Sequence, residues 1–154
     1  MAPYYLDSSA LVKRYVQEPG TSWVRRLTHR GTANQIYLAR ITAVEVTSAV
    51  ARRRSGKFLS RRQASSILTR FRKHLAGRYH VLEVVPAMLS EAMKLANSHG
   101  LRAYDAVQLA AAVELSSRSI KGGLGVVVLI SADGDLNKAA GLEGLRVENP
   151  NMHP

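Results

Sequence analysis

The stretch from residue 126 to residue 130 is continuously apolar, with three valines, a leucine and an isoleucine following Gly125. A short run of branched apolar residues is typical of a strand that is buried on both faces of a parallel sheet. Along the rest of the chain, patterns typical of strands alternate with patterns typical of helices. This alternation predicts an α/β fold with a mostly parallel sheet flanked by helices.

Apolar periodicity and helix-ending residues predict the individual elements. Strands are predicted at residues 4–6, 35–39, 81–85, 126–130 and 145–147. Helices are predicted from Ser8 or Ser9 to about residue 16, from about Trp23 to near Gly31, from Thr42 to Ser55, and over about 60–75, 86–99, 103–117 and 136–140. The chain of 154 residues suits one compact domain. We expect this domain at residues 1–148, followed by a short, frayed C-terminal tail at residues 149–154.

The compartment is predicted from three absences. The first residues lack the basic region of a secretory signal and reach an acid at Asp7. No apolar run approaches the roughly 20 residues that span a bilayer. Cysteine is absent, which excludes disulfides and cysteine-ligated zinc and is compatible with a reducing environment. We therefore expect a cytoplasmic protein without a membrane segment.

Positive charge is the unusual feature of the composition, with a formal net charge of +11 and an isoelectric point near 10.6. Ten of the 22 basic residues lie between Arg52 and Arg78, without an acid among them. A solvated helix face usually mixes both signs, so we favour contact with nucleic acid phosphates over solubility alone. The predicted contacts are Arg52, Arg53, Arg54, Lys57, Arg61 and Arg62.

Acidic residues stand at the ends of two predicted strands. Asp7 follows the first strand, and Asp133 and Asp135 follow the strand at 126–130. Ligands bind outside the carboxyl ends of strands in open parallel sheets, so these acids lie where sites usually form. For Asp7 or Asp133 taken alone, capping of the following helix is an alternative explanation.

Glu45 and Asp105 are flanked by apolar residues within predicted helices. A buried ionised carboxylate costs several kcal/mol unless a positive group compensates it. The compensating group could be an arginine, with Arg40 and Arg102 as candidates, or the positions could face water. A bound cation would instead compensate several carboxylates at once, and Mg²⁺ and Mn²⁺ prefer such oxygen ligands.

Four segments that carry these acids resemble the PIN domain and, more narrowly, the VapC-type ribonuclease toxins of prokaryotic toxin–antitoxin pairs. They are residues 5–11, 42–46, 104–112 and 129–136. No single segment is specific, but the four stand in the family's order, and the resemblance extends over about residues 4–147. It implies a three-layer α/β/α fold and cleavage of single-stranded RNA that depends on one or two Mg²⁺ or Mn²⁺ ions.

The resemblance also implies roles for single residues. Asp7, Glu45, Asp105 and Asp133 match the family's catalytic, metal-binding acids, and Asp135 matches an additional acid. Ser9 matches a hydroxyl near the first acid, and Ser131 stands where members often have threonine. Two departures, the glycine-rich stretch 122–125 and Gly134 in place of a bulkier residue, leave open whether Asp135 reaches the metal.

For this chain we expect an RNA substrate, a cognate antitoxin protein and a homodimer, the last two only because family members usually have them. Bases of the RNA could stack on Tyr15, Tyr37, Phe58 or Tyr79, among which the sequence does not choose. The alternatives are a PIN-type nuclease without a toxin role and a non-catalytic basic RNA-binding module. A receiver domain would need an adjacent acid pair after the first strand, and an Asp-x-Asp phosphatase would need an acid at position 9. Here Asp7 stands alone and position 9 is a serine, so the sequence fits neither class.

Overall fold

The computed structural model describes residues 3–154 and has a sheet of five parallel strands in the order β3-β2-β1-β4-β5. The strands are β1 (Pro3–Leu6), β2 (Gln35–Ala39), β3 (His80–Leu82), β4 (Val128–Ile130) and β5 (Arg146–Glu148). Because β1 is central, Leu6 pairs with Ile130 at its carboxyl end. The residues that follow β1 and β4 therefore lie next to each other at one edge of the sheet.

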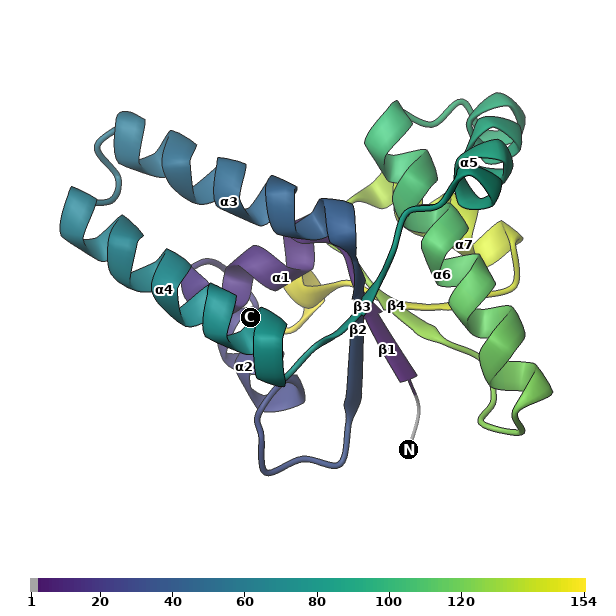
Figure 1. Ribbon diagram of the computed structural model, residues 1–154, viewed down its shortest axis with the longest axis horizontal. Coiled ribbons are helices and arrows are strands. Elements are labelled where there is room, and N and C mark those ends of the chain that lie inside the picture. The colour runs from purple at the N-terminus through teal and green to yellow at the C-terminus, as the bar shows by residue number, and fades with distance from the viewer. Residues whose placement is uncertain (1–2) are drawn as a thin grey trace.

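Seven α-helices in residues 3–154 cover the two faces of the sheet (Figure 1). They are α1 (Ser8–Tyr15), α2 (Thr21–Leu27), α3 (Arg40–Ser55), α4 (Arg61–Gly77), α5 (Pro86–His99), α6 (Ala103–Lys121) and α7 (Gly134–Leu142), with a 3₁₀ turn η1 (Pro150–Met152). Helices α1 to α4 lie on one side and α5 to α7 on the other. This arrangement confirms the predicted three-layer α/β/α fold. None of the helices in residues 3–154 is long and apolar enough to cross a membrane.

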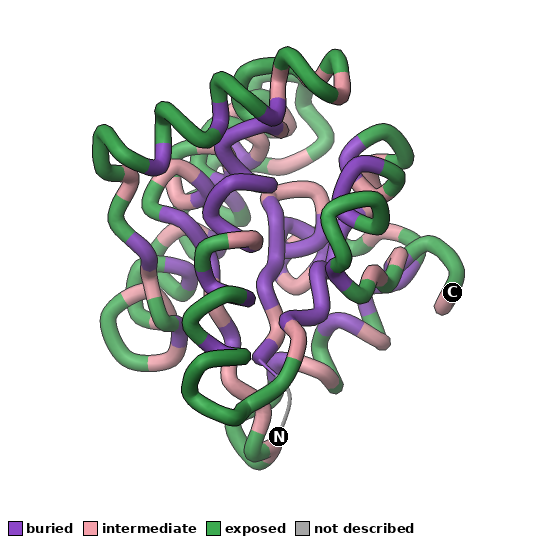
Figure 2. The backbone as a smooth tube through the Cα atoms, turned by 90° about the vertical axis from the view of Figure 1, so that its right-hand side faces the viewer, coloured by how far each residue is buried: buried purple, intermediate pink, exposed green. Residues whose placement is uncertain are grey.

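Two apolar cores hold the layers together, because successive strand residues point to opposite faces of the sheet. Tyr5 and Leu129 belong to the core shared with α5, α6 and α7. Their neighbours Leu6 and Ile130 belong to the core shared with α1 to α4. Figure 2 shows these buried strands in the middle of the molecule with mostly exposed helices around them.

Several element boundaries differ from the sequence prediction for local reasons. The cap of α1 is Asp7 rather than Ser8 or Ser9. Helix α3 begins at Arg40, and Thr42, predicted to cap it, is buried inside its first turn. Strand β4 begins only at Val128, because the N–H of the buried Val127 donates to the Ser116 hydroxyl rather than to a neighbouring strand (3.3 Å).

The C-terminal segment packs against the domain, whereas the sequence predicted a frayed tail. Pro150 is buried, and the imidazole of His153 stacks on the indole of Trp23 with ring centroids 4.4 Å apart. Gly20, with a φ of 88°, makes this approach possible, since an added Cβ would lie 2.3 Å from the carbonyl oxygen of Pro150. Contacts with α2 and with Gly20 thus hold this segment against the domain, which its composition did not predict.

Two helices, α3 and α4, lie side by side and extend away from the sheet as a hairpin (Figure 1). Ser60 caps α4 through a reciprocal pair of hydrogen bonds with Gln63. The hairpin is anchored in the core by Val46 and Val50 of α3 and by Ile67 and Phe71 of α4. Its outer end, which carries most of the basic segment, projects into solvent.

Candidate active site

Asp7 occupies the junction between the central strand β1 and helix α1, with 3% of its surface exposed. Its Oδ1 accepts a hydrogen bond from the backbone N–H of Ala10 (3.0 Å), so it caps α1. Burial raises the pKa of Asp7 to about 6, against the lowering effect of its hydrogen bonds, and the nearby charge of Glu45 raises it further. The fold therefore keeps a carboxyl group at a position where its charged form is unfavourable.

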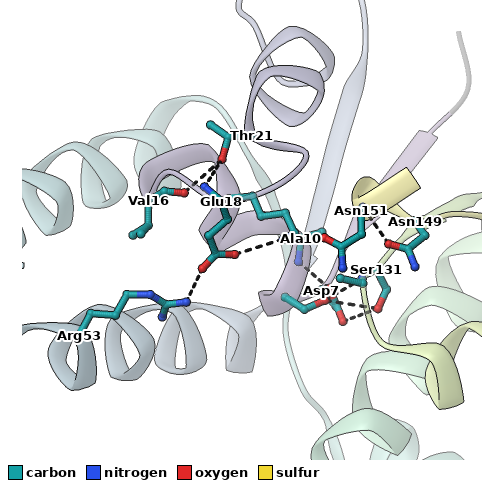
Figure 3. Close-up of polar contacts among 12 residues, drawn as sticks. Asp7, Ala10, Val16, Glu18, Thr21, Arg53, Ser131, Asn149 and Asn151 are labelled. Carbon is teal, nitrogen blue, oxygen red and sulfur yellow. Dashed lines mark hydrogen bonds and ion pairs between the residues drawn. The ribbon is translucent and has the colours of Figure 1, made fainter. Parts of the chain in front are cut away.

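Two serine hydroxyls connect Asp7 to the end of β4. Ser9 donates to Asp7 Oδ1 over 2.7 Å, and Ser131 donates to Asp7 Oδ2 over the same distance (Figure 3). The same hydroxyls accept hydrogen bonds from the backbone N–H groups of Ala132 (2.9 Å) and Asp133 (3.0 Å), respectively. Both oxygens of Asp7 are thereby held in place, and the loop after β4 is drawn against the end of β1.

Glu45, on the face of α3 toward the sheet edge, is positioned by two polar side chains. Its Oε2 accepts from the Ser8 hydroxyl (3.1 Å), and its Oε1 accepts from Gln108 Nε2 of α6 (2.6 Å). Gln108 is 1% exposed, and its Oε1 also accepts from the Tyr5 hydroxyl (2.5 Å) and from Thr42 (3.2 Å). This buried network fixes the distance between α3 and α6, and with it the position of Glu45.

Gln108 was not assigned a role from the sequence, although it lies within the segment around Asp105. Its signal was available, because an amide in an otherwise apolar stretch of a buried helix needs hydrogen-bond partners. Spacing was a second signal, since Gln108 lies three residues after Asp105 and so on a neighbouring face of the same helix. Its hydrogen-bond partners, on β1 and α3, could be identified only from the folded structure.

Asp105, Asp133 and Asp135 complete the group. Asp105 lies in the first turn of α6, and Asp133 caps α7 by accepting from the N–H of Leu136 (2.9 Å). Burial raises the pKa of Asp105, and the negative charges of Asp133, Glu45 and Asp135 raise it as well. We refer to Asp7, Glu45, Asp105, Asp133 and Asp135 as the carboxylate cluster.

Capping and arginine pairing were the alternatives for these acids. Asp7 and Asp133 do cap helices, each through its Oδ1. Capping leaves the Oδ2 atom of each carboxylate available for other ligands. Arg40 is not the partner of Glu45, because it pairs with Glu83 on the surface instead (3.1 Å between Nε and Oε1). Arg102 does lower the pKa of Asp105, but it forms no ion pair with an acid within residues 3–154.

Ion pairing divides the eleven acids of the chain into two groups. Within residues 3–154, no member of the carboxylate cluster has a lysine, arginine or histidine within ion-pair distance. Every other acid has one. Glu18 pairs with Lys13 and Arg53, and Glu83, Glu91 and Glu114 pair with Arg40, Lys94 and Arg118, respectively. Glu143 and Glu148 contact His99 and His153, whose imidazoles are positive only when protonated. In a protein of net charge +11, the cluster is thus an uncompensated concentration of negative charge.

The chemistry of the cluster fits a hard divalent cation, since all its potential ligands are carboxylate oxygens. In the side-chain positions of residues 3–154, no three His, Cys, Asp or Glu groups converge tightly enough to hold an ion directly. Mg²⁺ is usually bound through one or two carboxylates and keeps several waters. The residues present therefore supply oxygen ligands of the kind that such an ion takes.

The basic segment lies on the hairpin, and we refer to residues 52–62, which join α3 to α4, as the hairpin tip. Arg52, Arg54, Lys57, Arg61 and Arg62 are exposed there. Arg53 differs, because its guanidinium pairs with Glu18 (Figure 3) and also donates to the carbonyl of Ala49 (3.1 Å). Arg78 likewise has a structural role, because its guanidinium donates to the backbone carbonyls of residues 28, 29 and 34.

Solved structures with the same fold include proteins from toxin–antitoxin systems. A crystal structure of PAE2754 from Pyrobaculum aerophilum is 20% identical, with a TM-score of 0.65 over 99% of this chain and 86% of that one. A toxin–antitoxin complex from Klebsiella pneumoniae is 18% identical, with a TM-score of 0.63 over 96% and 97%. FitAcB from Neisseria gonorrhoeae is 18% identical, with a TM-score of 0.59 over 96% and 97%. These identities show a common fold.

Family membership comes from the sequence. A comparison with curated protein sequences finds no match. The model of the PIN domain family matches residues 4–142, which include every member of the carboxylate cluster. PIN domains are typically nucleases, and PIN nucleases generally use divalent metal ions. This chain belongs to the PIN domain family.

Proposed function

We propose that this protein is a metal-dependent endoribonuclease that cleaves single-stranded RNA, and that it is the toxin of a toxin–antitoxin pair. The observation that carries the nuclease proposal is the division of the acids, in which the five cluster carboxylates alone have no lysine, arginine or histidine within ion-pair distance in residues 3–154. Leaving such groups uncompensated in a basic protein costs stability, which is understandable if a cation supplies the missing charge.

Each residue has a defined part in this proposal. Asp7, Asp105 and Asp133 hold one or two Mg²⁺ or Mn²⁺ ions, directly or through water, and Asp135 extends this set. Glu45 completes the shell or orients the attacking water. Ser9 and Ser131 position Asp7 through the two 2.7 Å hydrogen bonds to its carboxylate. A divalent ion bound here supplies a water of lowered pKa and stabilises charge on the phosphoryl oxygens.

The test is cleavage of a fluorescently labelled single-stranded RNA in Mg²⁺ or Mn²⁺, compared with EDTA. We expect Asp105→Asn to lower cleavage at least about 1000-fold, equivalent to roughly 4 kcal/mol. Glu114→Gln is the matched control, because Glu114 lies on the same helix but is exposed and paired with Arg118. Cleavage that persists in EDTA, or that both variants retain equally, would exclude this mechanism.

A non-catalytic RNA-binding module is the second candidate, favoured by the exposed cations of the hairpin tip. It predicts RNA binding without cleavage under any metal condition. The same assay therefore separates the two candidates.

The toxin proposal rests on the structural neighbours, several of which are toxin–antitoxin complexes. It includes an antitoxin partner and a homodimer. Expression should arrest growth, and co-expression of the product of the adjacent gene should relieve the arrest. Harmless expression of an RNA-cleaving protein would instead identify a nuclease without a toxin role.

A further inference from the structure

Phe58 is the most exposed large apolar side chain in residues 3–154, with an exposed fraction of 84%. It lies at the hairpin tip, at the far end of the projecting helices (Figure 1). Exposure of an aromatic ring to this degree leaves its apolar surface in water at a cost of a few kcal/mol relative to burial. A ring in this position has no packing function within the described chain.

The loop that carries Phe58 is ordered rather than loosely attached. The N–H groups of Phe58 and Leu59 both donate to the carbonyl of Arg53, over 2.9 and 3.1 Å. Lys57 adopts a left-handed conformation with a φ of 63°, which is uncommon for a residue other than glycine. Leu59 packs into the core between the sheet and α1 to α4. This geometry turns Leu59 inward and directs Phe58 outward.

One side of the Phe58 ring is supported by backbone. A Cβ added to Gly56 would lie 3.1 and 3.2 Å from the ring atoms Cδ2 and Cε2, so the ring rests against the space that glycine leaves open. The remainder of the ring faces solvent, as its 84% exposure requires. The ring therefore has one side against the backbone of Gly56 and a free surface on the other.

Cations without acidic partners surround this ring. Arg54, Lys57 and Arg61 line the same surface hollow as Phe58. They are exposed, and none of them forms an ion pair within residues 3–154. An aromatic surface among free cations is the combination with which proteins bind single-stranded nucleic acid, stacking on bases and attracting phosphates.

The other aromatic residues considered for base stacking are occupied. Tyr15 and Tyr79 are buried, and their hydroxyl groups hydrogen-bond each other. Tyr37 stacks on His80 with ring centroids 4.7 Å apart. Phe58 has no such partner ring in the described chain.

We propose that Phe58 is a stacking platform for a base of single-stranded RNA, with flanking phosphates held by Arg54, Lys57 and Arg61. This inference rests on the proposed function for its choice of RNA as ligand. Helix α3 connects the platform to the carboxylate cluster. Ser55, at the end of α3, lies ten positions after Glu45, which corresponds to about 15 Å along the helix. A strand of a few nucleotides can span both, so the platform would engage RNA at a distance from the cleaved bond.

Binding of a single-stranded RNA containing 2-aminopurine tests the proposal, measured in EDTA so that cleavage plays no part. Phe58→Ala should weaken binding about tenfold and reduce quenching of the probe, whereas Phe58→Trp should preserve both. Phe58→Leu should behave like Phe58→Ala, since leucine is apolar but lacks a π face. Met93→Ala is the matched control, because Met93 is also highly exposed but lies on α5.

Three results would overturn the platform: unchanged RNA binding by Phe58→Ala, wild-type binding by Phe58→Leu, or an equal loss on duplex RNA. The second would indicate an apolar contact with a protein. A protein that binds RNA through Phe58 but never cleaves it would refute the nuclease and leave the platform intact. Cleavage without any contribution of Phe58 to binding would do the reverse.

Discussion

The carboxylate cluster and the hairpin tip are both groups of like charges, and within residues 3–154 Arg53 is the one member of either group that has an ion-pair partner. The two groups are nevertheless built in opposite ways. The cluster collects acids from four distant parts of the chain at a partly buried sheet edge. The tip collects cations from eleven consecutive positions, 52–62, on an exposed loop and two helix ends. Exposed charges are screened by water and salt, whereas buried ones are not.

This difference shows which of the two arrangements costs stability. Burial and mutual repulsion raise the pKa of Asp7 and Asp105, so their ionised forms oppose folding. The cations of the tip face water and repel one another only weakly. The cluster is therefore suited to a compact cation held inside the fold, whereas the tip is suited to a polyanion that binds from outside.

Removing the charge of Asp7 should give the largest change in stability. Its pKa is raised from 3.8 to about 6, so the folded protein binds more protons than the unfolded chain between these values. The contribution of Asp7 to the stability of the wild type in EDTA is therefore lost as the pH rises from about 4 to 6. Asp7→Asn, which can still cap α1, should be more stable than wild type above pH 6, by up to roughly 3 kcal/mol.

Urea unfolding in EDTA at pH 4 and pH 8 checks this difference. The advantage of Asp7→Asn should appear at pH 8 and vanish at pH 4. Asp135→Asn, which changes an exposed acid, serves as the control. An equal difference at both pH values would mean that buried charge is not the cause.

Divalent cations should stabilise the wild type by a slightly smaller amount. Mn²⁺ at 100 times its dissociation constant adds about 2.7 kcal/mol, which raises the melting temperature by roughly 5–10 °C. Asp105→Asn should lose most of this increase and Glu114→Gln should retain it, as thermal unfolding with and without Mn²⁺ will show. A similar increase in both variants would place the ion outside the cluster.

The smallest effects are expected from substitutions of two adjacent arginines on the hairpin. One of them has a structural role, and the other is proposed to bind RNA. Arg53→Ala removes the ion pair with Glu18 and should destabilise the fold by about 1–2 kcal/mol without changing the salt dependence of RNA binding. Arg54→Ala should change stability by less than about 0.5 kcal/mol. It should, however, reduce the slope of log affinity against log salt by about 0.7. Identical behaviour of the two variants would remove the distinction.

Much of the candidate site could be predicted from local sequence. Asp7 and Asp133 follow strands, and the carboxyl ends of neighbouring parallel strands always meet at one edge. Glu45 and Asp105 were noticed because ionisable groups are rare within apolar helical stretches. In contrast, Gln108 escaped assignment because its partners, Tyr5, Thr42 and Glu45, are distant in the sequence.

The same limit applies to the basic segment and the tail. Composition identified ten clustered cations, yet it could not separate Arg53, which pairs with Glu18, from Arg54, which faces water. Nor could it foresee that His153 stacks on Trp23 and orders the C-terminal segment.

The order of strands and helices, the excess of positive charge and the positions of the acids follow from the sequence, because periodicity, capping and strand-end placement are local properties. Which acids lack a counter-charge, and whether a ring such as that of Phe58 remains free, depends on the folded chain. Pairing and burial are relations between distant residues, and packing alone brings those residues together.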